Sequence, residues 1–180
     1  MKSPLSLGLV PLGVLIFAGT TLSAQQITKP TIAGSSYVSR LETTIACAGA
    51  TGPEAMPEIK KLGFVSVINL RQATESGVDI PAAEAAAKSA GLRYLHIPFN
   101  AAAPDPAVVD RFITAVKSPE NQPAFVHCGS ANRAAALWMV KRLVVDRWDV
   151  DKASTEAAAL GLTSAPLKQF ALDYAKSHSQ

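Results

Sequence analysis

Blocks of apolar residues alternate with amphipathic stretches along most of the chain. Short runs rich in β-branched and aromatic residues predict strands at residues 64–70, 92–97 and 123–127. A further strand is expected within residues 37–46, followed by a turn-rich stretch at 47–52. These segments are spaced by stretches long enough for helices, so the pattern indicates strands and helices in alternation.

Helix signals fill the intervals. Pro53 and Gly63 bracket a short helix at 53–62, and a second, Ala-rich helix is predicted at 81–91. Asp105 and Pro106 precede apolar residues at helical spacing, which predicts a capped helix there. After residue 132 only helices are predicted, at 133–145, 149–160 and 165–177.

This order predicts an α/β fold with a mostly parallel central sheet, flanked by helices on both faces and ending in an all-helical C-terminal tail. Ligands of such sheets bind at the carboxyl ends of the strands. Cys128, Arg71 and Asn100 are expected at that edge.

The N-terminus is typical of an export signal. Lys2 precedes an apolar stretch at 5–18, and small residues favour cleavage after Ala24. The apolar stretch is shorter than the roughly 20 residues that span a bilayer, and no Cys follows it for lipid attachment. We therefore expect a signal peptide at 1–24, an N-terminal extension at 25–36, one domain at 37–178, and a periplasmic or secreted protein without a stable membrane anchor.

Composition narrows the possible partners. The 180 residues are 48% hydrophobic and 17% charged, with a formal charge of +3, which suits one globular domain. Lys and Arg form no block, so we expect no nucleic-acid partner. No set of His, Cys, Asp and Glu has metal-ligand spacing, so we expect no metal and no cofactor. The sequence does not indicate an oligomeric state.

The candidate chemistry lies in the run Val126-His127-Cys128-Gly129-Ser130-Ala131-Asn132-Arg133, between a strand and a helix. Gly129 frees the backbone to curl, so that the N–H groups of residues 129–133 can surround one anion. The helix N-terminus and the Arg133 guanidinium add positive charge, which favours the thiolate form of Cys128. The run predicts a nucleophile in an anion-binding loop, against the simpler interpretation of a buried, inert Cys.

These residues resemble the signature loop of cysteine-dependent phosphatases of the dual-specificity type, and most closely the bacterial beta-lactamase-hydrolase-like, phosphatase-like domains. Residues 63–71 and His96-Ile97-Pro98-Phe99 resemble two further segments of that group, and the similarity spans roughly residues 37–174. The resemblance implies a dual-specificity phosphatase-like fold and hydrolysis of a small phosphorylated substrate. Cys128 would be the nucleophile, Arg133 and residues 129–132 would bind the phosphate, and His127 would orient the loop.

Three departures from that group leave the reaction open. Four residues separate Cys128 from Arg133 where most of these phosphatases have five, which shortens the loop by up to about 3.5 Å and resembles rhodanese-type sulfurtransferases. Ala134 replaces a hydroxyl residue. The expected general-acid Asp after Phe99 is absent, so Asp105 is the nearest carboxylate, although it also reads as a helix N-cap; Glu75, Asp79 and Asp110 are fallbacks.

Three other side chains are candidates for roles at the site. Arg71 could add a second positive charge for the substrate, or form an ion pair with Glu75. Asn132 could fix the loop through its amide. Cys47 could be a resolving thiol in a turn near the site, or a small buried residue, which we favour.

The leading hypothesis is a cysteine-dependent phosphatase. The alternatives are a sulfurtransferase that carries a persulfide on Cys128, and a non-catalytic protein that uses the loop to bind an anion. Helices alone after Arg133 favour the phosphatase, because rhodanese-like domains usually continue with another strand.

Overall fold

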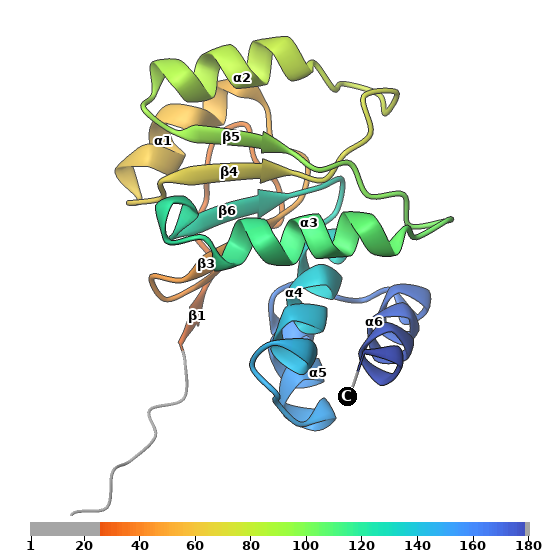
Figure 1. Ribbon diagram of the computed structural model, residues 1–180. Coiled ribbons are helices and arrows are strands. Elements are labelled where there is room, and N and C mark those ends of the chain that lie inside the picture. The colour runs from red at the N-terminus through yellow and green to blue at the C-terminus, as the bar shows by residue number, and fades with distance from the viewer. Residues whose placement is uncertain (1–25, 179–180) are drawn as a thin grey trace, which may run out of the picture.

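The computed structural model describes residues 26–178, which form a six-stranded sheet between two layers of helices (Figure 1). The strand order is β1-β2-β3-β6-β4-β5. The four strands from β3 to β5 run parallel, while β1 and β2 pair antiparallel at one edge. The strands are β1 (Ile27–Thr28), β2 (Ser39–Leu41), β3 (Ile45–Ala48), β4 (Ser66–Asn69), β5 (Arg93–His96) and β6 (Ala124–His127).

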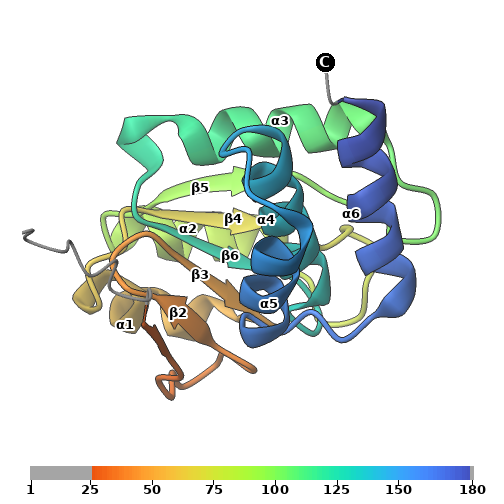
Figure 2. The ribbon, with the colours of Figure 1, turned by 90° about the horizontal axis from the view of Figure 1, so that it is seen from below.

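Helices cover both faces of the sheet, as predicted. Helices α1 and α2 lie on one face and α3 and α4 on the other, where α5 and α6 pack against α4 (Figures 1 and 2). The mostly parallel α/β fold and the all-helical tail are therefore confirmed. The helices are η1 (Pro53–Ala55), α1 (Met56–Lys61), α2 (Ile80–Ser89), α3 (Pro106–Lys117), η2 (Pro119–Asn121), α4 (Asn132–Val144), α5 (Val150–Ala159) and α6 (Ala165–Ser177).

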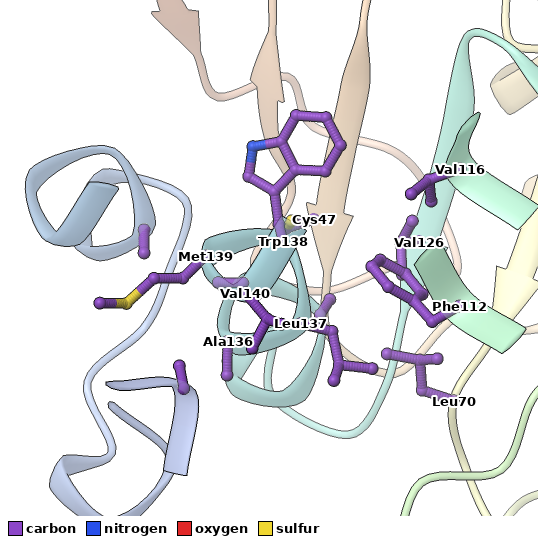
Figure 3. Close-up of a cluster of buried hydrophobic side chains, with 14 of the residues drawn as sticks. Cys47, Leu70, Phe112, Val116, Val126, Ala136, Leu137, Trp138, Met139 and Val140 are labelled. Carbon is purple, nitrogen blue, oxygen red and sulfur yellow. The ribbon is translucent and has the colours of Figure 1, made fainter. Parts of the chain in front are cut away.

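The sheet separates two apolar clusters. The larger one lies between the sheet and α3 to α6, with α4 at its centre, and the smaller one lies under α1 and α2. Figure 3 shows Trp138, Leu137 and Met139 of α4 in the larger cluster. A helix that is apolar on most sides is buried by its neighbours, as α4 is here. It begins at Asn132, within the run of residues 126–133 that the sequence singles out.

The predicted strand at 37–46 is two strands instead of one. Chain reversal at 42–44, where Glu42 has a left-handed backbone (φ 43°), joins β2 to β3 as an antiparallel hairpin. The predicted turn at Cys47 is also wrong, because Cys47 belongs to β3 and pairs in register with Val126 of β6. Small residues make up most of β3, so the strand lacks the β-branched signal that marks the others.

Residues before Tyr37 join the fold. β1 pairs with β2, and Ile32 is buried in the smaller cluster. The domain start at residue 37 stays a prediction, and the proposed signal peptide at 1–24 lies outside the described residues. Between residues 26 and 178, no helix is both long enough and apolar enough to cross a membrane.

Candidate active site

Cys128 follows the carboxyl end of β6 and is 1% exposed. Its N–H donates to the carbonyl of Ala48 at 3.1 Å, while the carbonyl of His127 accepts from the N–H of Leu70 at 2.9 Å. The backbone leading into the loop is thus held by β3 on one side and by the end of β4 on the other. The main chain of Cys128 is therefore fixed to the buried central strands of the sheet.

The left-handed residue of the loop is Ala131 (φ 66°), whereas Gly129, from which the curl was expected, does not have a positive φ. Ala131 is buried and precedes the first turn of α4. Gly161 makes room for it, because a Cβ at Gly161 would come within 2.9 Å of the Ala131 Cβ. The loop conformation therefore depends on a glycine in the connection between α5 and α6.

Asn132 ties the loop to that same connection. Its Oδ1 accepts from the N–H groups of Thr163 and Ser164, both at 2.7 Å, and its Nδ2 donates to the Oγ of Ser130 at 3.3 Å. The predicted fixing of the loop through the Asn132 amide agrees with these contacts.

Replacing Asn132 tests whether these hydrogen bonds stabilise the fold. Asn132→Ala removes the acceptor for two backbone N–H groups, and we expect a loss of about 1–3 kcal/mol in the free energy of unfolding. Asn132→Asp keeps that acceptor and serves as the matched control, with a smaller loss. Urea denaturation of both variants measures the difference, and equal losses would contradict the role of the acceptor oxygen.

Arg133 projects from the first turn of α4 and is held by a carboxylate that the sequence did not single out as its partner. Nη1 and Nη2 of Arg133 donate to Oε1 and Oε2 of Glu75 at 2.6 and 2.8 Å. Nη1 also lies within 3.3 Å of the Leu70 carbonyl and 3.2 Å of the Phe99 carbonyl. The hydrogen bonds to Glu75 raise the pKa of Arg133, and the side chain of Cys128 acts in the same direction.

The donors of Arg133 divide into two pairs. The end-on donors are the Nη1–H groups and one Nη2–H. They are used by the bonds to Glu75 and to the carbonyls of Leu70 and Phe99. The guanidinium also has a hydrogen bond to the side chain of Cys128, which contributes to the raised pKa of Arg133. The bonds to Glu75, Leu70 and Phe99 leave the Nε–H and the second Nη2–H, which form the side-on pair. A guanidinium can bind two oxygens of one anion through such a pair.

Glu75 joins both arginines of the site. Its Oε2 also accepts from Nε of Arg71 at 3.1 Å, and its Oε1 accepts from the N–H of Gln72 at 2.8 Å. The hydrogen bond from Arg133 is the main reason that the pKa of Glu75 falls to about 2. A carboxyl with so low a pKa is ionised at neutral pH, so Glu75 is unsuited to the fallback role of general acid.

Arg71 and Asp105, which were predicted as site residues, both make structural hydrogen bonds. Arg71 makes the alternative ion pair with Glu75, and its Nη2 donates to the Ser76 carbonyl at 2.6 Å, so its side chain is anchored to its own loop. Asp105 is the N-cap of α3, where its Oδ1 accepts from the N–H of Ala107 at 2.9 Å. A substrate role for either residue stays a prediction.

His127 lies on the opposite face of the sheet from Cys128, as the alternation of a strand predicts. Its side chain is 1% exposed, and neither ring nitrogen makes a hydrogen bond of good geometry to residues 26–178, although the backbone of Cys128 lies near enough to act on its pKa. The role of His127 in orienting the loop stays a prediction. Burial, reinforced by the charges of Arg71 and Arg133, lowers the pKa of His127 to about 3. The ring is therefore neutral at physiological pH.

The pKa of His127 predicts acid sensitivity of the fold. Because its folded pKa of about 3 lies below its ordinary value of 6.5, its contribution to stability is complete above pH 6.5 and is lost as the pH falls toward 3. We expect the free energy of unfolding to fall between pH 6.5 and 4.5, by up to about 1.4 kcal/mol per pH unit for this proton.

Urea denaturation across this pH range measures the effect, with His127→Asn as the comparison. The variant should show a flatter slope between pH 6.5 and 4.5. Glu75, whose pKa is lowered from 4.5, adds its own loss only below about pH 4.5. An unchanged slope in His127→Asn would contradict the assignment.

Cys47 is the buried residue that we favoured. It lies in the larger apolar cluster beside α4 (Figure 3). Burial, together with the nearby charge of Cys128, raises the pKa of its thiol. Both cysteines are free. A thiol with a raised pKa is a weak nucleophile, so β3 supplies packing beside the site.

A hollow of about 570 Å³ adjoins the outer side of the loop. Its lining includes Ser130 and Asn132 of the loop, together with Lys29 and Tyr37. Tyr37 is 73% exposed and has a left-handed backbone (φ 51°), an uncommon conformation for an aromatic residue.

Comparison with known proteins adds family evidence. The model of the family described as "Beta-lactamase hydrolase-like protein, phosphatase-like domain" matches residues 38–145. No curated protein matches the sequence.

Solved structures share the fold. A DUF442 protein named as a phosphatase, from Shewanella putrefaciens CN-32, has 18% identity and a TM-score of 0.66, covering 81% of this chain and 95% of its own. TpbA of P. aeruginosa has 21% identity and a TM-score of 0.64, covering 87% and 91%. The core catalytic domain of the PP-IP phosphatase SIW14 of S. cerevisiae, in complex with citrate, has 16% identity and a TM-score of 0.64, covering 79% and 87%. At these identities the likeness shows the fold.

Proposed function

Because the chain belongs to the family of beta-lactamase hydrolase-like proteins, phosphatase-like domain, we propose that it hydrolyses a phosphate monoester with Cys128 as the nucleophile. The observation that carries the proposal is the pairing of a buried Cys at the end of β6 with Arg133 in the first turn of α4. Glu75 holds Arg133 by its end-on donors, so that its side-on pair is available to two phosphate oxygens.

The reaction would proceed in two displacements. The Cys128 thiolate attacks phosphorus, a P–S bond forms, and the P–O bond to the leaving group breaks with its electron pair on oxygen. Water then attacks phosphorus, the P–S bond breaks, and inorganic phosphate and the thiolate are released. Arg133 and the dipole of α4 would stabilise the charge on the phosphate oxygens in both steps.

Asp105 is our candidate for protonating the leaving group. It lies just after the segment that follows β5, but its side chain already caps α3. Substrates with good leaving groups need no acid, whereas an alkyl ester does, and such proton transfer is worth about 10²–10⁴-fold.

The variant Asp105→Asn separates the two roles of this residue, because Asn is also a good N-cap. We expect it to hydrolyse para-nitrophenyl phosphate at nearly the normal rate but to lose about 10²-fold or more on an alkyl phosphate. Steady-state rates on the two esters give the ratio. Equal effects on both esters would leave Asp105 with its structural role alone.

Substrate class is suggested by the neighbours, one of which is TpbA in a Cys-to-Ser variant bound to phosphotyrosine. We propose a small anionic phosphate ester whose leaving group lies in the hollow beside the loop, against Tyr37.

We also propose that the protein acts outside the cytoplasm, on the basis of residues 1–24. N-terminal sequencing of the protein from a periplasmic fraction should begin at Gln25.

The test of the proposed function is a pair of assays on the purified protein. One uses para-nitrophenyl phosphate and the other thiosulfate with cyanide, which reports the sulfurtransferase reaction. Release of phosphate without formation of thiocyanate supports the phosphatase. Thiocyanate formation with an inert phosphate ester would favour the short-loop alternative, and vanadate binding without turnover in either assay would favour a non-catalytic anion-binding protein.

A further inference from the structure

A small cavity lies behind the catalytic loop, on the face of the sheet covered by α1 and α2. Its volume is about 40 Å³, and its lining includes His127, Asn69 and Arg71 from the strands and Asp79 at the start of α2. It is distinct from the hollow beside Tyr37, which shares no lining residue with it. The cavity has no part in the proposed phosphate chemistry.

The ring of His127 is the unexplained feature of this cavity. It is almost fully buried, yet neither Nδ1 nor Nε2 has a partner within residues 26–178. A neutral imidazole carries one N–H donor and one acceptor nitrogen, and leaving such groups unpaired in the interior costs about 1–3 kcal/mol. Native proteins rarely leave a buried polar group in this condition, and ordered water commonly supplies the missing partner.

Other groups in the lining have hydrogen-bonding capacity to spare. Arg71 uses Nε and Nη2 for Glu75 and Ser76, and no hydrogen bond within the described chain involves its Nη1. Asp79 uses Oδ1 to cap α2 through Ala82, and no hydrogen bond within residues 26–178 involves its Oδ2. The residues that line the cavity thus include both donors and acceptors beyond those already bonded. No group of three His, Cys, Asp or Glu in residues 26–178 could hold a metal ion.

We propose that this cavity binds an ordered internal water molecule that hydrogen-bonds to the ring of His127 and links it to Arg71 and Asp79. A water needs about 10–15 Å³ of such volume and two to four polar partners, so the cavity has room for it. Gly77 and Asp79 in the lining are exposed, which gives water a way in. Water can both donate and accept, as a neutral imidazole requires.

The water would make His127 a positioning residue for the loop. The backbone of His127 is already fixed between β3 and β4, and Cys128 follows it directly. A hydrated ring would fix the side chain as well, through a water molecule that does not titrate near neutral pH. This consequence rests on the proposed function, whereas the hydration site itself does not.

Two measurements on the intact protein test the site directly. A high-resolution crystal structure should show a solvent peak within hydrogen-bond distance of one ring nitrogen of His127. NMR of histidine-labelled protein should show cross-relaxation between the His127 ring N–H and water. A ring turned to bond protein atoms, or a cavity closed by a side chain, would overturn the proposal. The Cys128→Ser protein should give the same signals, so an inactive enzyme would not affect the outcome.

A double-mutant cycle gives an independent test. Ala83 is buried in the cavity wall, and Ala83→Val would displace the water and leave His127 unpaired. We expect Ala83→Val to lower the folding equilibrium constant in the natural protein by about 5- to 100-fold more than in a His127→Leu background, where no water is needed. Additive effects in the cycle would contradict the water link. If His127→Leu does not fold, the crystallographic and NMR tests on the natural chain still decide.

Discussion

The Cys128→Ser variant is expected to lose turnover of para-nitrophenyl phosphate by a factor on the order of 10⁴ or more. The hydroxyl that replaces the thiol is not ionised at neutral pH, so the P–S bond of the first displacement has no equivalent that forms at a useful rate. The fold should persist, because the hydroxyl is smaller than the thiol and the backbone N–H of residue 128 keeps its hydrogen bond to the carbonyl of Ala48. Phosphate release and the urea midpoint, measured on one preparation, separate the two effects.

Cys47 provides the matched control for this loss. It is the only other Cys of the chain, and it belongs to the same apolar cluster as Cys128, but it is part of β3. Cys47→Ala should keep turnover within about tenfold while it lowers stability by removing buried sulfur. Comparable losses of activity in the two variants would mean that packing, rather than nucleophilicity, explains the effect of Cys128.

The second large effect is expected at Arg133, where Arg133→Lys should lower kcat by about 10²–10³-fold. A lysine carries one compact ammonium, which cannot bind Glu75 with two parallel bonds and also offer two donors to a phosphate. The loss should appear mainly in kcat, because the oxyanion charge is greatest in the transition state.

Arg71→Lys is the comparison for that variant. Arg71 bonds to the same Glu75 carboxylate but is anchored to the Ser76 carbonyl rather than to the loop. We expect a loss below about tenfold, in keeping with an arginine that helps to hold Glu75. A loss equal to that of Arg133→Lys would instead support the direct substrate contact considered from the sequence.

Much of the fold is predictable from local pattern, because strands and helices in this chain carry strong signals. Asp105, Asp149 and Ser164 cap the helices that follow them, and each boundary was found within a residue or two. The hairpin of β2 and β3 was missed. Its second strand is made mostly of small residues, whose burial depends on pairing with β6, and such long-range pairing leaves little trace in local sequence.

The site was predictable only in part. Cys128 and Arg133 stand close together in sequence, so their motif is visible, whereas Glu75 reaches Arg133 from another loop 58 positions away. The spacing of Arg71 and Glu75 in the sequence did indicate that Glu75 binds an arginine. That spacing alone predicts an ion pair with Arg71, however, and gives no sign of the contact with Arg133. The left-handed Ala131 could not be foreseen either, because its strain is accommodated by the space above Gly161.

The contacts between the loop and the α5–α6 connection determine how far this protein can be truncated. The family match ends at Val145, yet Gly161, Thr163 and Ser164 lie beyond it and contact Ala131 and Asn132. A fragment trimmed to the matched region would retain Cys128 and Arg133. It would lose the contacts of Gly161, Thr163 and Ser164 that hold the turn between them. The minimal working unit therefore extends past the boundary that family similarity alone suggests.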